Sequence, residues 1–169
     1  MSLINTKSIR QFLLATCATL ILGSPVFAGH DVQGPSGGIS GTSFSDFGAS
    51  NEKINTIWVR AGAWIDSVHT QFISTGGVLR TTPHRGGFGG GFNTITLAAN
   101  EDVTSVTGYY NGSYVQQLRV RTSLGNTYTY GNAVGRFFSY YIPDGAKFAG
   151  FRGASGSFVD SIGAIWRPQ

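Results

Sequence analysis

The sequence predicts an all-β fold, on three observations. From His30 onward, no stretch of a dozen residues repeats its apolar side chains with the 3.6-residue period of an amphipathic helix. Short runs instead alternate apolar and polar side chains, as at 68–72 and 117–121. Glycine, asparagine and other turn-forming residues separate these runs. Many short strands at near-regular spacing are typical of a sandwich, a barrel or a prism.

Each run bounded by turn residues is an expected strand. In the run 67–72, Val68, Thr70 and Phe72 would share one face, and in the run 117–121 Leu118 and Val120 would do so. Similar runs follow in chain order at Ile54 to Arg60, Asn93 to Leu97, Val103 to Tyr110, Thr127 to Tyr130, Phe137 to Ile142, Ala146 to Phe151 and Ser161 to Arg167.

The connections between these strands contain turn sequences and glycine clusters. Tyr110 to Ser113 predicts a two-residue hairpin and Pro143 to Gly145 a tight turn, since both supply residues that tolerate positive φ. Glycine clusters at 34–41 and 86–91 interrupt the strand pattern. We expect the second cluster to be a flexible connection, because it lacks both the following helix and the Lys-Ser/Thr pair of a phosphate-binding loop.

The first 28 residues are expected to be a secretory signal peptide. Lys7 and Arg10 precede an apolar run from Phe12 to Leu22, and small residues around Ala28 provide a cleavage site. The run is shorter than the roughly 20 apolar residues of a membrane-spanning helix, so no membrane insertion is expected. Cleavage after Ala28 would leave one exported domain, 29–169, extracellular or periplasmic. Cys17 would be lost with the leader, so the domain would contain no disulfide.

Composition argues against several classes of function. The 169 residues fit a single domain. The formal net charge is +4, but Lys7 and Arg10 belong to the expected leader, and the remaining cations are spread along the chain. Nucleic-acid binders usually concentrate cations on one face, so no nucleic acid is expected as a partner.

Catalytic motifs are weak, and we expect no enzyme and no cofactor. The segment 34–38 has the G-x-S-x-G spacing of a hydrolase nucleophile turn but lacks the helix that should follow, so we interpret it as a turn. His30, His69 and His84 are too scattered for a metal site and are expected at the surface or in hairpins. No pair of carboxylates can be nominated for glycoside hydrolysis.

The segment 150–163 carries the most specific signal. A glycine-rich loop there ends in Asp160 and continues into an apolar strand. A carboxylate accepts hydrogen bonds, and the backbone N–H groups of Ser157 and Phe158 beside it donate them, which suits the vicinal hydroxyls of a sugar. The alternative is a hairpin loop in which Asp160 only caps backbone N–H groups.

Gly156 to Asp160 resembles the G-x-x-x-D sugar-binding loop of the jacalin-related lectins. The segment 34–44 resembles the first glycine-rich strand and loop of that family. Further segments follow the family pattern in order, and the resemblance covers 32–168: Ile54 to Ile65, Gly86 to Leu97, Val103 to Tyr110 and Ile142 to Gly153.

The resemblance implies a β-prism of three four-stranded antiparallel sheets with pseudo-threefold symmetry. It also implies one carbohydrate site, in which Asp160 accepts from two sugar hydroxyls and the N–H groups of Ser157, Phe158 and Gly41 donate. A neighbouring hairpin, 109–115 here, usually walls the site. Tyr114 is then a candidate for contact with a sugar face, or else an exposed hairpin tyrosine.

The resemblance further implies a mannose- or glucose-type specificity. Galactose-preferring members have a chain cut that frees an amino group at the first-loop glycine, whereas the start expected here, near Gly29, lies well before Gly41. Because single hydrogen bonds contribute little net affinity, several sites, for example in a homo-oligomer, would be needed for avidity. The expected partners are therefore glycans, and the alternative is a structural or protein-binding prism whose sugar site is silent.

Overall fold

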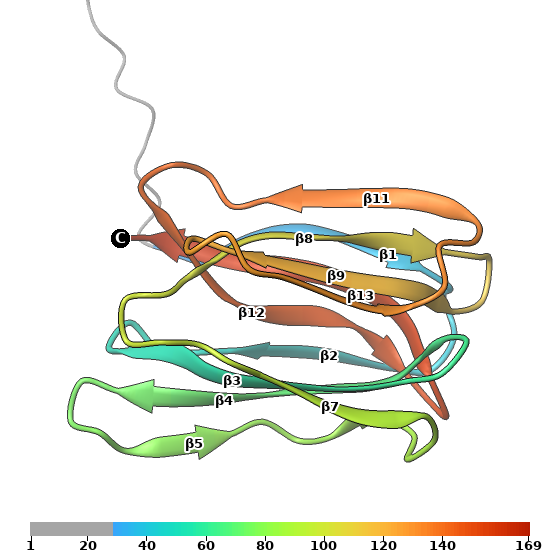
Figure 1. Ribbon diagram of the computed structural model, residues 1–169, viewed down its shortest axis with the longest axis horizontal. Coiled ribbons are helices and arrows are strands. Elements are labelled where there is room, and N and C mark those ends of the chain that lie inside the picture. The colour runs from blue at the N-terminus through green and yellow to red at the C-terminus, as the bar shows by residue number, and fades with distance from the viewer. Residues whose placement is uncertain (1–28) are drawn as a thin grey trace, which may run out of the picture.

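The computed structural model describes residues 29–169, which form thirteen β-strands in three antiparallel sheets (Figure 1). Within this range no helix is long and apolar enough to cross a membrane. The predicted leader, its cleavage site and Cys17 lie outside the described residues.

The first sheet joins the two ends of the described chain. It has the strand order β1-β13-β12-β2, and its bounds are β1 (Asp31–Gly37), β13 (Val159–Pro168), β12 (Ala146–Ser155) and β2 (Thr42–Phe47). β12 and β13 form a hairpin, and the N-terminal strands β1 and β2 pair with its two outer edges.

The second sheet is built from a single stretch of chain. Its central hairpin is β3 (Glu52–Ala61) and β4 (Ile65–Ser74), with β7 (Gly91–Thr96) beside β3. Two short strands, β5 (Leu79–Thr81) and β6 (Arg85–Gly86), share the edge of β4, pairing with its second and first halves. The sheet thus has four strand positions, of which the outermost is divided in two.

The third sheet repeats this layout without the division. It has the order β10-β9-β8-β11, with bounds β10 (Thr127–Gly131), β9 (Val115–Thr122), β8 (Val103–Tyr110) and β11 (Arg136–Tyr141). All three sheets therefore place a hairpin at the centre and one strand on either side. This is the β-prism expected from the sequence.

Apolar side chains from all three sheets meet along the prism axis. The fully buried members include Ile57 and Val59 of β3, Val106 of β8, Leu118 of β9 and Ile162 of β13. Burying one such side chain stabilises a fold by about 1.5–3 kcal/mol. The alternating patterns seen in the sequence are the inward and outward faces of these strands.

The strands that the alternation predicted are all present, but four others lacked a signal. β1 and β5 have no fully buried residue, and Phe44 is the only buried residue of β2. The flexible connection predicted at 86–91 is wrong at both ends, because Gly86 pairs with Ser67 and Gly91 with Ala61.

The hairpin at Tyr110 to Ser113 is present, but not by the predicted mechanism. Neither Asn111 nor Gly112 has a positive φ. The carboxamide oxygen of Asn111 instead accepts hydrogen bonds from the N–H groups of Ser113 and Tyr114, at 2.8 and 2.7 Å. The turn is therefore set by an asparagine side chain. The turn at 143–145 forms as predicted, with Gly145 at φ 74°.

One contact recurs in all three sheets where an outer strand passes the central hairpin. A glycine with positive φ lies against a backbone carbonyl of the hairpin, and the next N–H donates to that oxygen. The three donor–acceptor pairs are Gly38 to Asp160 at 2.8 Å, Gly87 to Asp66 at 2.9 Å and Asn132 to Gln116 at 2.9 Å. The preceding glycines are Gly37, Gly86 and Gly131, with φ of 139°, 116° and 78°. The pseudo-threefold symmetry thus extends to individual backbone hydrogen bonds.

We predict that Gly131→Ala destabilises the protein far more than Gly125→Ala. Both glycines have positive φ, but a Cβ at Gly131 would lie 2.1 Å from the Gln116 carbonyl oxygen, whereas nothing lies within 4 Å of one at Gly125. Left-handed strain alone costs about 1–2 kcal/mol. The clash should add about 1–3 kcal/mol at Gly131. Urea denaturation measures both, and equal losses would contradict the close-approach argument.

Candidate functional site

Three hairpin loops at one end of the prism share a five-residue pattern. Each has glycine, any residue, an aromatic residue, a β-branched residue and then an acid or its amide analogue. The three segments are Gly62 to Asp66, Gly112 to Gln116 and Gly156 to Asp160. They join β3 to β4, β8 to β9 and β12 to β13. From the sequence, only the third was expected to end in a sugar acceptor, and the second was expected only as a wall of the site, although the shared spacing was a signal that links all three.

Asp160 is a buried carboxylate with an unused oxygen. The residue is 4% exposed, and its Oδ2 atom has no hydrogen-bond partner among the described residues. Gly41 lies directly against this oxygen, since a Cβ on Gly41 would be 2.4 Å from it. Gly41 has φ 79°, in the left-handed region that favours glycine. The structure therefore brings together Gly41 and Asp160, two predicted site residues from opposite parts of the sequence.

Burial raises the pKa of Asp160, and the nearby backbone N–H groups of Gly156 and Asp160 itself act in the opposite direction. Burial penalises the charged form because it removes water from around the carboxylate. An ionised Asp160 is thus a strong acceptor that has lost part of its hydration. A ligand hydroxyl that donates a hydrogen bond to Oδ2 would replace the lost hydration.

The loop before Asp160 presents free donors. It is closed by the Gly156 N–H, which donates to the Phe158 carbonyl at 3.0 Å. The N–H groups of Ser157 and Phe158 form no backbone hydrogen bond with the described residues. Ser157 is exposed and Phe158 half-buried. The loop therefore places two donors beside one desolvated acceptor, the combination expected from the sequence.

Tyr114 packs against aromatic rings from the other two hairpin loops. Its ring centroid is 5.3 Å from that of Trp64 and 5.0 Å from that of Phe158, and the Trp64 and Phe158 centroids are 5.0 Å apart. The three rings come from the same position of the three loops. We call them the aromatic cap. Tyr114 and Phe158 thus pack between loops, Tyr114 is not an isolated hairpin residue, and its contact with a sugar stays a prediction.

The loop before Asp66 reproduces the arrangement at Asp160. The Gly62 N–H donates to the Trp64 carbonyl at 3.0 Å, as Gly156 does to Phe158. Asp66 is 7% exposed, and Cβ atoms on Gly89 and Gly90 would lie 2.4 and 2.5 Å from its carboxylate oxygens. Gly90 has φ 63° and stands where Gly41 stands in the first sheet. A second carboxylate thus lies against a glycine-rich backbone.

A guanidinium fixes the glycine run that faces Asp66. Arg60 Nη1 donates to the carbonyl oxygens of Phe88, Gly89 and Gly90, at 2.9, 3.2 and 3.0 Å. These three hydrogen bonds hold the glycine run in place beside Asp66, so the run is not a flexible connection. The third loop differs, because Gln116 replaces the acid and its buried Nε2 lacks a hydrogen-bond partner in the described chain. A neutral amide cannot supply the charged acceptor, so two of the three loops place a carboxylate against a glycine-rich backbone.

The remaining motifs take structural roles. Ser36 of the G-x-S-x-G segment lies in a bulged part of β1, not in a turn, and its Oγ accepts from the Tyr140 hydroxyl at 2.6 Å. His69 lies within β4 and stacks on Trp58, with ring centroids 4.7 Å apart. The described residues hold no group of three or more metal-ligating side chains.

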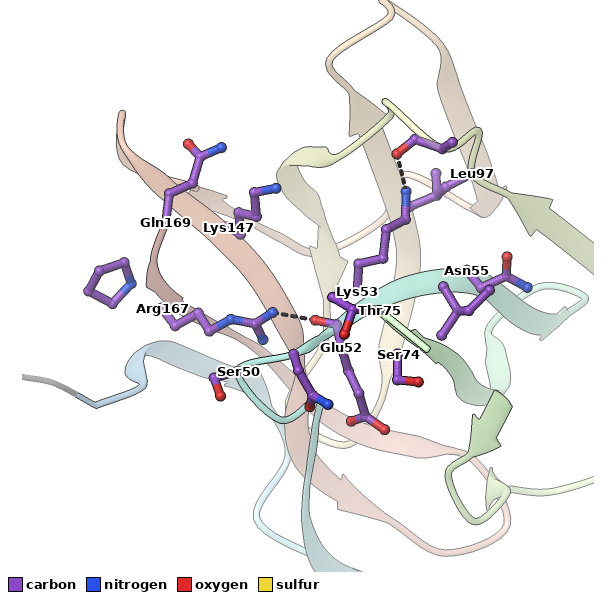
Figure 2. A pocket seen from close by; sticks show the side chains of 14 residues that line it. Ser50, Glu52, Lys53, Asn55, Ser74, Thr75, Leu97, Lys147, Arg167 and Gln169 are labelled. Carbon is purple, nitrogen blue, oxygen red and sulfur yellow. Dashed lines mark hydrogen bonds between the residues drawn. The ribbon is translucent and has the colours of Figure 1, made fainter. Parts of the chain in front are cut away.

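The cavity of about 570 Å³ shown in Figure 2 lies at the other end of the prism, where β3 begins and β13 ends. Its cations already have acceptors. Lys53 Nζ donates to the carbonyls of Ala98 and Ala99, and Arg167 donates to those of Gly48 and Glu52. These bonds connect loops at this other end of the prism, away from the three hairpin loops.

We predict that the free energy of unfolding of the wild type, relative to Asp160→Asn, increases as pH falls from 7 toward 4. Because the folded-state pKa of Asp160 is raised, the native state binds a proton before the unfolded state does, which stabilises it as pH decreases. Urea denaturation at several pH values measures the difference. Asp144→Asn, in an exposed turn, is the control, and a difference for Asp160→Asn that is constant or shrinks on acidification would refute the desolvation argument.

We also predict that Tyr114→Phe preserves glycan binding and stability, whereas Tyr114→Ala lowers both. Phenylalanine keeps the ring of the aromatic cap and loses only the hydroxyl. Truncation of a large packed aromatic ring typically costs about 3–5 kcal/mol, and less at this half-buried position. Thermal unfolding and titration with mannotriose provide the two measurements. A large loss of affinity in Tyr114→Phe with unchanged stability would contradict this prediction and indicate that the Tyr114 hydroxyl contacts the sugar directly.

Comparison with known proteins agrees with the geometry. The Jacalin-like lectin domain family matches residues 33–165. Horcolin from Hordeum vulgare is 35% identical over 140 residues, covering 80% of this chain and 95% of its own length.

Solved structures of similar proteins have the same fold. AcmJRL, a mannose-binding jacalin-related lectin from Ananas comosus, superimposes with a TM-score of 0.72 at 25% identity, over 83% of this chain and 99% of its own. Artocarpin, solved in complex with mannotriose, superimposes with a TM-score of 0.72 at 26% identity, over 80% of this chain and 96% of its own. With its three-sheet prism and its family match from residue 33 to residue 165, this chain belongs to the jacalin-related lectins.

Proposed function

We propose that the protein binds mannose- or glucose-type glycans at the loop that ends in Asp160. The observation that carries this proposal is the unpaired, buried Oδ2 of Asp160 beside the free N–H groups of Ser157 and Phe158. Two adjacent sugar hydroxyls can donate to the carboxylate while their oxygens accept from the loop. Solved relatives support the sugar class, since the Ananas comosus protein is described as mannose-binding and artocarpin was solved with mannotriose.

A second site of the same kind is proposed at Asp66. The carboxylate lies against Gly89 and Gly90, and the preceding loop closes through the same N–H to carbonyl bond as the loop at Asp160. Each hydrogen bond to a sugar replaces one to water and contributes about 0.5–1.5 kcal/mol net, so a single site of this kind is weak. Two sites at one end of a prism would raise the avidity for branched or repeating glycans.

The proposed activity is binding without turnover, on a chain that is exported. This rests on the family, which is one of lectins. Export rests on the basic, then apolar, then small-residue pattern of 1–28. A silent prism that binds another protein is the alternative function, and the following experiment separates the two.

On a glycan array and by titration with mannotriose, we expect the wild type to bind mannose- or glucose-terminated glycans. Asp160→Ala should lose most of this binding, Asp66→Ala should lower avidity, and the double variant should bind nothing, because each change removes a charged acceptor. Circular dichroism checks that each variant is folded. Absence of binding by folded wild type would favour the silent prism, and release of nitrophenol from a chromogenic mannoside would indicate catalysis.

A further inference from the structure

The strands of the third sheet carry arginines but no acidic side chain. No aspartate or glutamate occurs between Asp102 and Asp144, a stretch that contains Arg119, Arg121 and Arg136. This stretch supplies all four strands of the sheet β10-β9-β8-β11. Three cations therefore lie in a sheet whose strands carry no acidic side chain, which gives this side of the prism a local excess of positive charge.

The register of the sheet places two of these arginines on its outer face. Arg119 and Arg121 are exposed and alternate along β9 with the buried Leu118 and Val120. Residues two apart on a strand are about 7 Å apart, so the two guanidinium groups form a short row of charge. Arg136, by contrast, lies at the end of β11 that faces the hairpin loops.

Hydroxyl groups and aromatic rings continue the rows across the sheet. Arg119 lies opposite Thr107, and Thr107 opposite Ser139. The second row runs from Arg121 through Ser105 to Tyr141.

At one end of this face, the rings of Tyr109 and Phe137 pack edge to face with centroids 5.4 Å apart. Phe137 and Tyr141 are 57% and 64% exposed. The outer face of the third sheet, which we call the arginine face, thus combines two exposed cations, the hydroxyls of Thr129 and Ser139, and accessible rings, whereas Ser105 and Thr107 between them are buried.

The arginines of this face have no carboxylate partners among the described residues. The ion pairs among the described residues lie in other parts of the molecule and join Asp46 to Arg85, Glu52 to Arg80 and Asp102 to Lys147. Arg119 makes a single side-chain bond, from Nε to Thr129 Oγ1 at 3.2 Å. Three cations of the other two sheets are paired with carboxylates, whereas Arg119 and Arg121 leave their charge available to an external anion.

We propose that the arginine face binds an acidic polysaccharide, a chain of sugars carrying carboxylate or sulfate groups. Guanidinium groups recognise both anions through paired hydrogen bonds. Thr129 and Ser139 can bond sugar hydroxyls beside the charged groups, and Tyr141 offers a ring against which a sugar can stack. The face is a sheet surface rather than a groove, and it lies on a side of the prism, whereas Asp160 and Asp66 lie at its end. The two kinds of site should therefore bind independently.

The test compares retention of the protein on immobilised heparin and on immobilised polygalacturonate, eluted with salt, against neutral dextran. The wild type should be retained on both acidic matrices and released by salt, since screening weakens such contacts. The double variant Arg119→Gln/Arg121→Gln should bind about tenfold more weakly at low salt, with a shallower salt dependence. Arg152→Gln, which removes a charge from the first sheet, is the matched control and should elute near the wild type.

Two further measurements separate this proposal from the sugar site and from other anions. Asp160→Ala should keep heparin and polygalacturonate binding, while Arg119→Gln/Arg121→Gln should keep mannotriose binding and the wild-type melting temperature. Equal elution of the double variant and the wild type, or an equal loss in Arg152→Gln, would overturn the proposal. Tighter binding to single-stranded RNA or to anionic lipid vesicles than to either polysaccharide would overturn it as well.

Discussion

The close approach of an outer strand to each central hairpin is the constraint on which the rest of the structure depends. At Gly37, Gly86 and Gly131 the backbone of one strand lies against a hairpin carbonyl, and the next N–H donates to it. In two of the three cases that carbonyl belongs to the residue whose side chain is the proposed sugar acceptor, Asp160 or Asp66. In these two sheets, the backbone hydrogen bond between the outer strand and the hairpin therefore also fixes the position of the residue that carries the binding carboxylate.

Function and stability oppose one another at Asp160. An oxygen that is buried and left without a donor costs the folded state free energy, and burial is also the main cause of the raised pKa. The carboxylates with structural roles show the opposite behaviour, since hydrogen bonds from Arg80 to Glu52 and from Thr122 to Glu101 lower the pKa of each acid. A sugar hydroxyl at Asp160 would supply the hydrogen-bond donor that the buried oxygen lacks among the described residues.

Sequence reasoning found what depends on periodicity or on a local motif, and little else. The buried hairpin strands alternate and were predicted, whereas β1 and β5 expose most of their residues and leave no period to detect. The loop ending in Asp160 was found by its resemblance to a family, but its counterpart ending in Asp66 was overlooked. The packing of Tyr114 was not predicted, because its neighbours Trp64 and Phe158 come from other sheets and only the threefold arrangement brings them together. The arginine face was hidden for the same reason, since sheet register groups charges that the linear sequence separates.

The pairing of β1 and β2 with the hairpin of β12 and β13 has a consequence for the order of assembly. The second and third sheets are each continuous in sequence and can form as soon as their own strands are made. The first sheet needs strands from both ends of the described chain. The contact between Gly41 and Asp160 therefore cannot form until β13 has been synthesised. A chain that has begun to fold therefore completes its Asp66 loop early and its Asp160 loop last. Sugar binding at Asp160 would accordingly report on completed folding, since a chain stopped before β13 would lack the sugar site at Asp160.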